Sequence, residues 1–366
     1  MPDLPPVETA ARLDRLRARF AHEGCDALVV SDLVNVRYLT GFTGSNATLL
    51  VTPDSATLVT DGRYRTQSAE QLEASGVEAS IVIANGPGPE LAAAARGISR
   101  IGLEADDVSW AVQRRWSVDT FSWAHLVPTE GVVLRLRAVK DAGEVARLEA
   151  ACAIADAALA DVAHRLHDGL TEQQFRRELE DAMVEHGSEG PSFETIVASG
   201  PNGAKPHARP GDRVIGSSGA GEFVVVDFGA TVDGYHSDMT RTLPVGSLSE
   251  IQERMYDVVR RSQASGVERV AAGVSCKAVD DTCREVIADA GWADAFAHGT
   301  GHGIGLVIHE SPRLSSVSGE VLEAGNCVTV EPGVYLPEHG GVRIEDSVVV
   351  TDEGCRLLTG APYASC

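Results

Sequence analysis

VVVDFGATVDGYHSDMTRT, residues 224–242, has the dipeptide Asp233-Gly234 between two segments that each contain an aspartate. Asp-Gly between two strand-like segments is a strong signal for a tight β-hairpin. Folding the chain at this turn brings Asp227 and Asp238 nearly opposite each other on adjacent strands, with their Cβ atoms about 5 Å apart. The segment therefore predicts a hairpin that presents two carboxylates side by side.

A second acidic pair follows further along the chain. Glu331 in VTVEPGVY and Glu345 in VRIEDSV flank the turn signal LPEHGG, so a second hairpin pairs them in the same way. His302 lies between the two hairpins in the Gly-rich stretch HGTGHGIG. We expect both hairpins to pack in one sheet and the histidine to approach from a glycine-rich turn.

These five side chains together indicate a metal site. Buried ionised carboxylates are costly unless cations pair with them, and nearby Lys and Arg are too few to do so. Any one of these acids alone is more simply a surface residue or a hydrogen-bond acceptor, but two acidic hairpins with a histidine have no common structural explanation. Four carboxylates and a neutral imidazole carry a charge of about −4, which two divalent cations cancel. The oxygen and nitrogen donors predict Mn²⁺ first, with Co²⁺, Zn²⁺ or Fe²⁺ as alternatives.

The composition is that of a globular protein with more than one domain. The chain has 366 residues, of which 43% are hydrophobic, and single cores seldom exceed about 250–300 residues. A net charge of −22 disfavours nucleic-acid and anionic-membrane partners. Seven cysteines without a CxxC pair and an acidic, proline-containing N-terminus predict reduced thiols and a cytoplasmic location.

Two domains are predicted, with a boundary near residue 137. Residues 1–136 alternate β-rich runs, among them VRYLTGF, with helical segments, which is typical of a small α/β domain. Residues 137–366 predict an α+β domain with outer helices and a curved antiparallel sheet. Asp141 with Glu144, and Thr171 with Gln174, resemble capping boxes, and Ser249 and Ser275 are expected to cap two later helices.

The five acidic and histidine positions, in their DxTRT, HGTGHGIG, EPGVY and RIED contexts, resemble the metallopeptidases of the "pita-bread" fold. That family includes methionine aminopeptidase, aminopeptidase P and prolidase. YLTGFTGSNATLLV and LVTDGRY resemble the creatinase-type N-terminal domain, and RAVKDAGEVARLEAA resembles the start of the catalytic domain in Xaa-Pro peptidases. The resemblance covers nearly the whole chain.

The resemblance implies roles for individual residues. Asp227 would bind one metal ion, His302 and Glu331 mainly the other, and Asp238 and Glu345 both. Glu331 would also receive a proton from the attacking hydroxide. The remaining catalytic and substrate-binding candidates are His207, Tyr235, His298, His309, Arg313, Tyr335 and Arg343.

These candidates have different expected tasks. The three histidines would hydrogen-bond the substrate and assist proton transfer. Arg343 would organise the site near Tyr335, and Arg313 would bind a substrate carboxylate. Simpler alternatives remain open: His207 as a loop histidine, His298 as a core histidine, Arg313 as a surface cation and Tyr235 as a packing residue.

The creatinase-like pairing of domains implies hydrolysis of the imide bond before proline. The substrates would be Xaa-Pro dipeptides, as for prolidase, or the N-termini of longer peptides, as for aminopeptidase P; Arg313 and the compact length favour dipeptides. Two alternatives are a creatinase-like hydrolase of small amides and a non-catalytic peptide-binding protein of the same fold. The resemblance also implies a homodimer.

Overall fold

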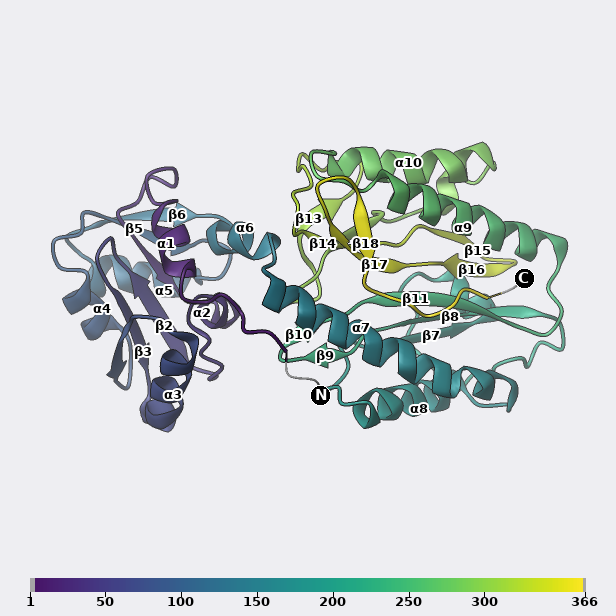
Figure 1. Ribbon diagram of the computed structural model, residues 1–366, viewed down its shortest axis with the longest axis horizontal. Helices are drawn as coiled ribbons and strands as arrows, with labels where there is room; N and C mark the ends of the chain where they lie inside the picture. Colours follow the sequence, from purple (N-terminus) through teal and green to yellow (C-terminus); the bar gives the residue numbers. More distant parts are fainter. Residues whose placement is uncertain (1–3, 365–366) are drawn as a thin grey trace. The chain divides into compact units, whose positions relative to one another are not determined.

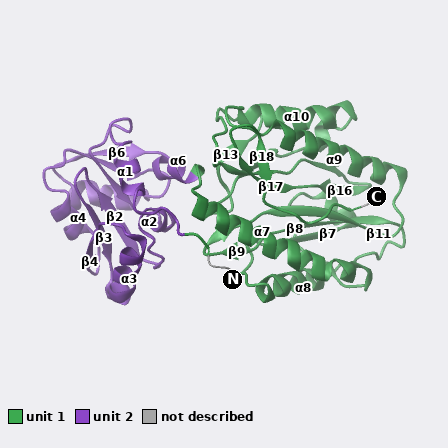
Figure 2. Cartoon of the chain, viewed as in Figure 1, with its two compact units in different colours: residues 1–5, 138–366 green, residues 6–137 purple. Residues whose placement is uncertain are grey.

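The computed structural model describes residues 4–364 and contains two compact units. One unit is residues 6–137, and the other comprises residues 1–5 and 138–366 (Figure 2). The helix α6, Val132–Ala138, ends where the first unit gives way to the second (Figure 1). Among residues 4–364, no helix is long and apolar enough to cross a bilayer.

The first unit is an α/β domain built on a six-stranded mixed sheet in the order β4-β3-β2-β1-β5-β6. The β1–β2 and β2–β3 pairs are antiparallel, whereas β1–β5, β3–β4 and β5–β6 are parallel. Its strands are β1 Ala27–Val30, β2 Ala47–Val51, β3 Ala56–Thr60, β4 Ser80–Ile83, β5 Arg100–Glu104 and β6 His125–Thr129. Its other helices are α1 Arg12–Arg17, α2 Leu33–Thr40, η1 Gly62–Tyr64, α3 Arg65–Ser75, α4 Gly88–Ala94, α5 Trp110–Arg115 and the π-helical η2 Trp116–Thr120.

One β-rich run of the first unit is a helix instead. VRYLTGF lies mostly within α2, where Asp32 caps the first turn by accepting a hydrogen bond from Val34 N. Gly41 ends the helix with a φ of 76°, a conformation that glycine adopts without steric cost. The cap and the terminating glycine therefore outweigh the β-propensity of Val36 and Tyr38.

The second unit has four long helices whose predicted starts are confirmed. The helices are α7 Ala142–Val162, α8 Glu172–Glu185, α9 Glu250–Arg269 and α10 Cys276–Asp289, with short helices η3 Ala163–His167, η4 Gly200–Ala204 and η5 Ala293–Ala295. Asp141 with Glu144, Thr171 with Gln174 and Ser249 with Gln252 form capping boxes. The Ser275 side chain accepts a hydrogen bond from Ala278 N.

The strands of the second unit pair antiparallel throughout the described residues, but they form several ladders instead of one sheet. The ladders are β11-β8-β7, β13-β12-β14-β17-β18, β15-β16 and β10-β9. The strands are β7 Ile196–Ser199, β8 Glu222–Phe228, β9 Thr231–Val232, β10 Tyr235–His236, β11 Met239–Val245, β12 Gly301–Gly303, β13 Glu310–Leu314, β14 Cys327–Val330, β15 Gly333–Leu336, β16 Gly340–Arg343, β17 Asp346–Val350 and β18 Cys355–Leu357.

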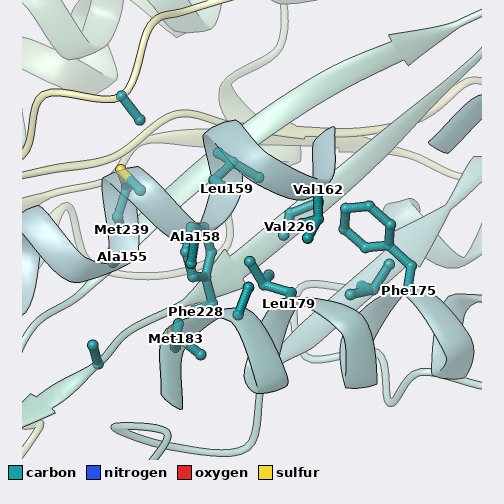
Figure 3. Close-up of a cluster of buried hydrophobic side chains, with 14 of the residues drawn as sticks. Ala155, Ala158, Leu159, Val162, Phe175, Leu179, Met183, Val226, Phe228 and Met239 are labelled. Atoms are coloured by element: carbon teal, nitrogen blue, oxygen red, sulfur yellow. The ribbon is translucent and has the colours of Figure 1, made fainter. Parts of the chain in front are cut away.

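Two hydrophobic cores hold the helices against these strands. The first joins α7 and α8 to β8 and β11, and Figure 3 shows Leu159, Phe175 and Leu179 facing Val226 and Phe228. The second joins α9 and α10 to β14 and β17. In Figure 1 the two helix pairs accordingly lie on opposite sides of the strands. The β11-β8-β7 ladder thus packs against α7 and α8, and the β13-β12-β14-β17-β18 ladder packs against α9 and α10.

Candidate metal centre and active site

The first acidic hairpin is longer than a single turn. Asp233 and Gly234 have φ values of 46° and 65° at the two-residue turn between β9 and β10, as type I′ geometry requires. Further from the turn, β8 pairs with β11, and Asp227 faces Thr240. Asp238 lies two residues before Thr240, so it is a diagonal neighbour of Asp227 on the same face, close to the nearly opposite position predicted.

The second acidic pair lies where two ladders separate. Val330 pairs with Asp346 on one side, and Gly333 pairs with Arg343 on the other. The register is unchanged across the gap, so Glu331 faces Glu345. In the gap their backbone N–H groups turn to other segments: Glu331 N donates to Thr300 O at 2.7 Å, and Glu345 N donates to Thr240 O at 3.2 Å.

His302 is held with one ring nitrogen facing the acids. Its Nδ1 lies 3.1 Å from Gly303 O, to which it can only donate. Nε2 lies 3.5 Å from Asp238 Oδ2 and 3.4 Å from Glu331 Oε1. Burial lowers the pKa of His302 to about 3, so the ring is neutral and Nε2 has a lone pair available for a metal ion.

The carboxylates are close enough to share cations. Ligand atoms of Asp227, Asp238 and Glu345 all lie within 4.8 Å of one another. Within residues 4–364, Asp227 Oδ1 and Glu345 Oε1 are buried and have no hydrogen-bond partner. Buried acceptors without a donor are rare in native proteins, and these oxygen and nitrogen donors suit divalent metal ions.

The pKa values of the carboxyl groups show that ionising all of them without bound cations is unfavourable. Burial, followed by the charges of Glu345 and Asp227, raises the pKa of Asp238 well above its ordinary value. Burial and the charges of Glu331 and Asp227 do the same to the pKa of Glu345. Burial raises the pKa of Glu331 to about 8. Bound cations would remove this cost by pairing with the ionised forms.

A hydrogen-bonded chain runs from this cluster to His298. Arg343 donates to Asp227 Oδ2 through one terminal nitrogen and to Tyr335 Oη, at 2.9 Å, through the other. Tyr335 Oη lies 2.8 Å from His298 Nε2, and His298 Nδ1 lies 2.8 Å from Gly299 O. Since Nδ1 donates to the carbonyl, Nε2 accepts from the tyrosine hydroxyl, and burial lowers the pKa of His298 to about 4.

A cavity of about 710 Å³ lies over the acidic cluster. It is lined by all five predicted metal ligands and by His207, His298, His309, Arg313 and Arg343. The His309 ring packs against His302 with a centroid separation of 4.4 Å. Tyr335 lies behind the cavity lining and reaches it through His298. Tyr235 is not brought to the cavity: it is buried and its hydroxyl donates to Glu144 Oε1.

Comparison with known proteins gives the family of the chain. Residues 146–352 match the model of metallopeptidase family M24, and residues 12–139 match the creatinase/prolidase N-terminal domain. The chain belongs to metallopeptidase family M24. All five predicted ligands lie within the part of this M24 chain that matches the family model.

Individual relatives agree with this assignment. An uncharacterized peptidase, YqhT, of Bacillus subtilis is 40% identical to this M24 chain, covering 96% of the chain and 98% of the relative. A solved Xaa-Pro dipeptidase from Bacillus anthracis has a TM-score of 0.92 at 37% identity, with 96% and 98% of the two chains covered. An X-Pro aminopeptidase from Thermotoga maritima has a TM-score of 0.86 at 32% identity, with 96% and 99% covered. The predicted fold, an α/β creatinase-like unit followed by an α+β pita-bread unit, is confirmed.

Two residues of the site were missed in the sequence. Thr240 Oγ1 donates to Glu345 Oε2 at 2.7 Å, and Thr329 Oγ1 donates to Glu331 Oε1 at 3.2 Å. Each threonine lies two residues from an acid, Asp238 or Glu331. The alternation of side chains along a strand places residues two apart on one face, so this spacing is a signal that could have identified both.

Proposed function

We propose that this protein hydrolyses the imide bond between a residue Xaa and proline, using two divalent metal ions. The observation that supports this most directly is the convergence of Asp227, Asp238 and Glu345 within 4.8 Å, with His302 and Glu331 adjoining, at the floor of a cavity. Mn²⁺ is the first candidate metal, and Co²⁺, Zn²⁺ and Fe²⁺ are the alternatives. When bound, such a pair of ions supplies a nucleophile at neutral pH and polarises the scissile carbonyl.

The chain's own residues hold and orient the reactants. Asp227, Asp238, His302, Glu331 and Glu345 are the proposed ligands, and Glu331, whose Oε1 lies 3.4 Å from His302 Nε2, is also proposed to accept a proton during the reaction. His309 and His207 line the same cavity and are proposed to hydrogen-bond the substrate. His298 would act on the substrate in the orientation that Tyr335 and Arg343 give it.

A preference for dipeptides is proposed from Arg313. This guanidinium lines the cavity on β13, where His302 and Arg313 are paired across the strands. A guanidinium that lines the same cavity as the ligand cluster suits the free carboxylate of a C-terminal proline. Relatives named both Xaa-Pro dipeptidase and X-Pro aminopeptidase leave longer peptides as the second candidate substrate.

The experiment that tests the proposal compares peptides under defined metals. Metal-free protein is reconstituted with Mn²⁺, Co²⁺, Zn²⁺ or Fe²⁺ and incubated with Ala-Pro, Met-Pro and an Xaa-Pro-Xaa peptide. Cleavage of the dipeptides alone supports a dipeptidase, and cleavage of the longer peptide supports an aminopeptidase. Metal binding without cleavage of any of these peptides contradicts the proposed function and favours a small-amide hydrolase or a peptide-binding protein.

We also propose a homodimer in the cytoplasm. Within residues 4–364, the six cysteines are all free, and five of them are buried, which agrees with a reducing compartment. Sedimentation as a monomer at micromolar concentration would contradict the dimer.

A further inference from the structure

A buried ion pair lies directly beside the loop that carries His309. Lys140 Nζ is 3.0 Å from Glu310 Oε2, and the two side chains are only 1% and 0% exposed. Taking both charges out of water is costly, and replacing such a pair by apolar residues is often neutral or stabilising. Its presence in the interior therefore calls for an explanation other than stability.

The carboxylate of Glu310 also organises the backbone of this loop. The loop, residues 304–309, connects β12 to β13 and has Val307 and His309 at its exposed part. Glu310 Oε1 accepts a hydrogen bond from Val307 N at 3.1 Å. A side chain added at Gly305 would meet Glu310 Oε2 at 2.7 Å, so the loop backbone lies directly against the carboxylate.

Lys140 is itself fixed to the segment just before β14, the strand that pairs with β12. Its backbone N–H donates to Gly325 O at 2.9 Å, and Val139 forms a β-bridge with Asn326, just before β14. The Lys140 ammonium group thus connects the segment just before β14 to the loop between β12 and β13. His309 is the residue immediately before Glu310, and its ring contacts the proposed metal ligand His302.

We propose that Lys140 and Glu310 form a positioning pair that fixes His309 over the metal centre. The Glu310 carboxylate holds the backbone of Val307 by a hydrogen bond, and the Lys140 ammonium group holds that carboxylate by the ion pair. His309 lies between Val307 and Glu310 in the sequence and is therefore fixed on both sides. Neither Lys140 nor Glu310 touches the substrate. The part of this inference that concerns turnover rests on the proposed function, whereas the part that concerns loop order does not.

Loop order is tested by hydrogen exchange in Lys140→Met and Glu310→Gln. We expect the amides of residues 304–309 to exchange at least about tenfold faster in both variants, while those of β8 and β11 are unchanged. Leu179→Ala removes a buried side chain of α8 and is the control for a general loss of stability. Lys277→Met removes a charge from the exposed Lys277–Asp281 pair on α10 and is the control for loss of a charge. Unchanged exchange of the loop in both pair variants overturns the proposal, whatever the enzyme's substrate is.

Turnover of an Xaa-Pro dipeptide gives the second readout. We expect Glu310→Gln to lower kcat by about 10- to 100-fold through misplacement of His309, with metal content and KM nearly unchanged. In a His309→Ala background the same change is expected to cost less than about twofold, because the residue it positions is gone. Equal losses in both backgrounds overturn the proposal. Should a single variant not fold, the double variant Lys140→Met with Glu310→Met, which leaves no buried charge, replaces it and is expected to show the same loop exchange.

Discussion

Thr240 Oγ1 donates a 2.7 Å hydrogen bond to Glu345 Oε2 and also accepts one, at 3.1 Å, from Arg343 Nε. This hydroxyl leaves the other carboxylate oxygen of Glu345 as the atom without a partner. One threonine thereby determines which oxygen of a proposed bridging ligand faces the metal site.

Replacing Thr240 by valine is expected to weaken metal binding. Glu345 loses the donor that orients it, and loss of hydrogen bonds in this buried position costs about 1–3 kcal/mol of stability. Thr242→Val is the matched control, since Thr242 is also buried in β11 and its hydroxyl bonds the backbone C=O and N–H of Arg343 instead of a ligand side chain. Calorimetric titration with Mn²⁺ measures the difference, and equal affinity losses in the two variants would contradict the role of Thr240.

Glu345→Gln and Asp238→Asn are expected to stabilise the metal-free protein and to reduce its stabilisation by metal. Without metal each change removes a buried carboxyl group whose ionisation is disfavoured by burial and by neighbouring acids, so the melting temperature rises. With Mn²⁺ present, the stabilisation that the ions give the wild type is largely lost. Metal analysis and thermal unfolding with and without Mn²⁺ check this against the exposed control Glu338→Gln. An unchanged metal content in both variants is incompatible with the proposed ligand set.

Tyr335→Phe is expected to lower kcat about tenfold while metal content is retained. The hydroxyl joins Arg343 to His298, and without it His298 Nε2 loses the donor that fixes its orientation. Steady-state kinetics on an Xaa-Pro dipeptide, with metal analysis of the same sample, provides the measurement. Tyr64→Phe in the other unit is the control. A rate equal to that of the wild type would remove this chain of hydrogen bonds from the mechanism.

Glu104 gives the first unit a predictable pH dependence. Burial raises the pKa of this carboxyl to about 6 from 4.5, although it accepts hydrogen bonds from Ser31 N, Asp32 N and Asn35 Nδ2. The folded state thus binds the proton more tightly than the unfolded state. The contribution of Glu104 to the free energy of unfolding is therefore fully present below pH 4.5. It is lost as the pH rises through about 6, a change of about 2 kcal/mol.

The comparison with Glu104→Gln measures this contribution. Denaturant unfolding is followed by tryptophan fluorescence, since Trp110, Trp116 and Trp123 lie in this unit and only Trp292 lies in the other. Between pH 4.5 and 6 the wild type is expected to lose stability relative to the variant. The same pH slope in both proteins would mean that Glu104 titrates normally.

Much of the fold could be predicted because its signals are local. Caps such as Asp141 and Thr171 act within one helical turn, and the Asp233-Gly234 turn needs only two left-handed residues. The error at VRYLTGF has a local cause as well: Asp32 and Gly41 bound a helix whose interior has β-branched and aromatic residues.

The geometry of the site was less accessible from the sequence. The second acidic hairpin is predicted with one continuous strand in each arm, but both arms break at the proposed ligand, Glu331 or Glu345. The break depends on backbone partners at Thr300 and Thr240, distant in the sequence, which no local pattern reveals. The same holds for Lys140 and Glu310, which lie 170 residues apart.

The unchanged register on both sides of Glu331 and Glu345 restricts how this part of the chain can vary in length. Inserting or deleting one residue between Val330 and Gly333, or between Arg343 and Asp346, would offset one ladder against the other and rotate a carboxylate away from the centre. The turn at residues 337–339 has no such restriction, because it lies beyond the last paired residues Leu336 and Gly340. Changes in loop length should therefore be tolerated at residues 337–339. A change in length next to Glu331 or Glu345 is expected to disrupt the site.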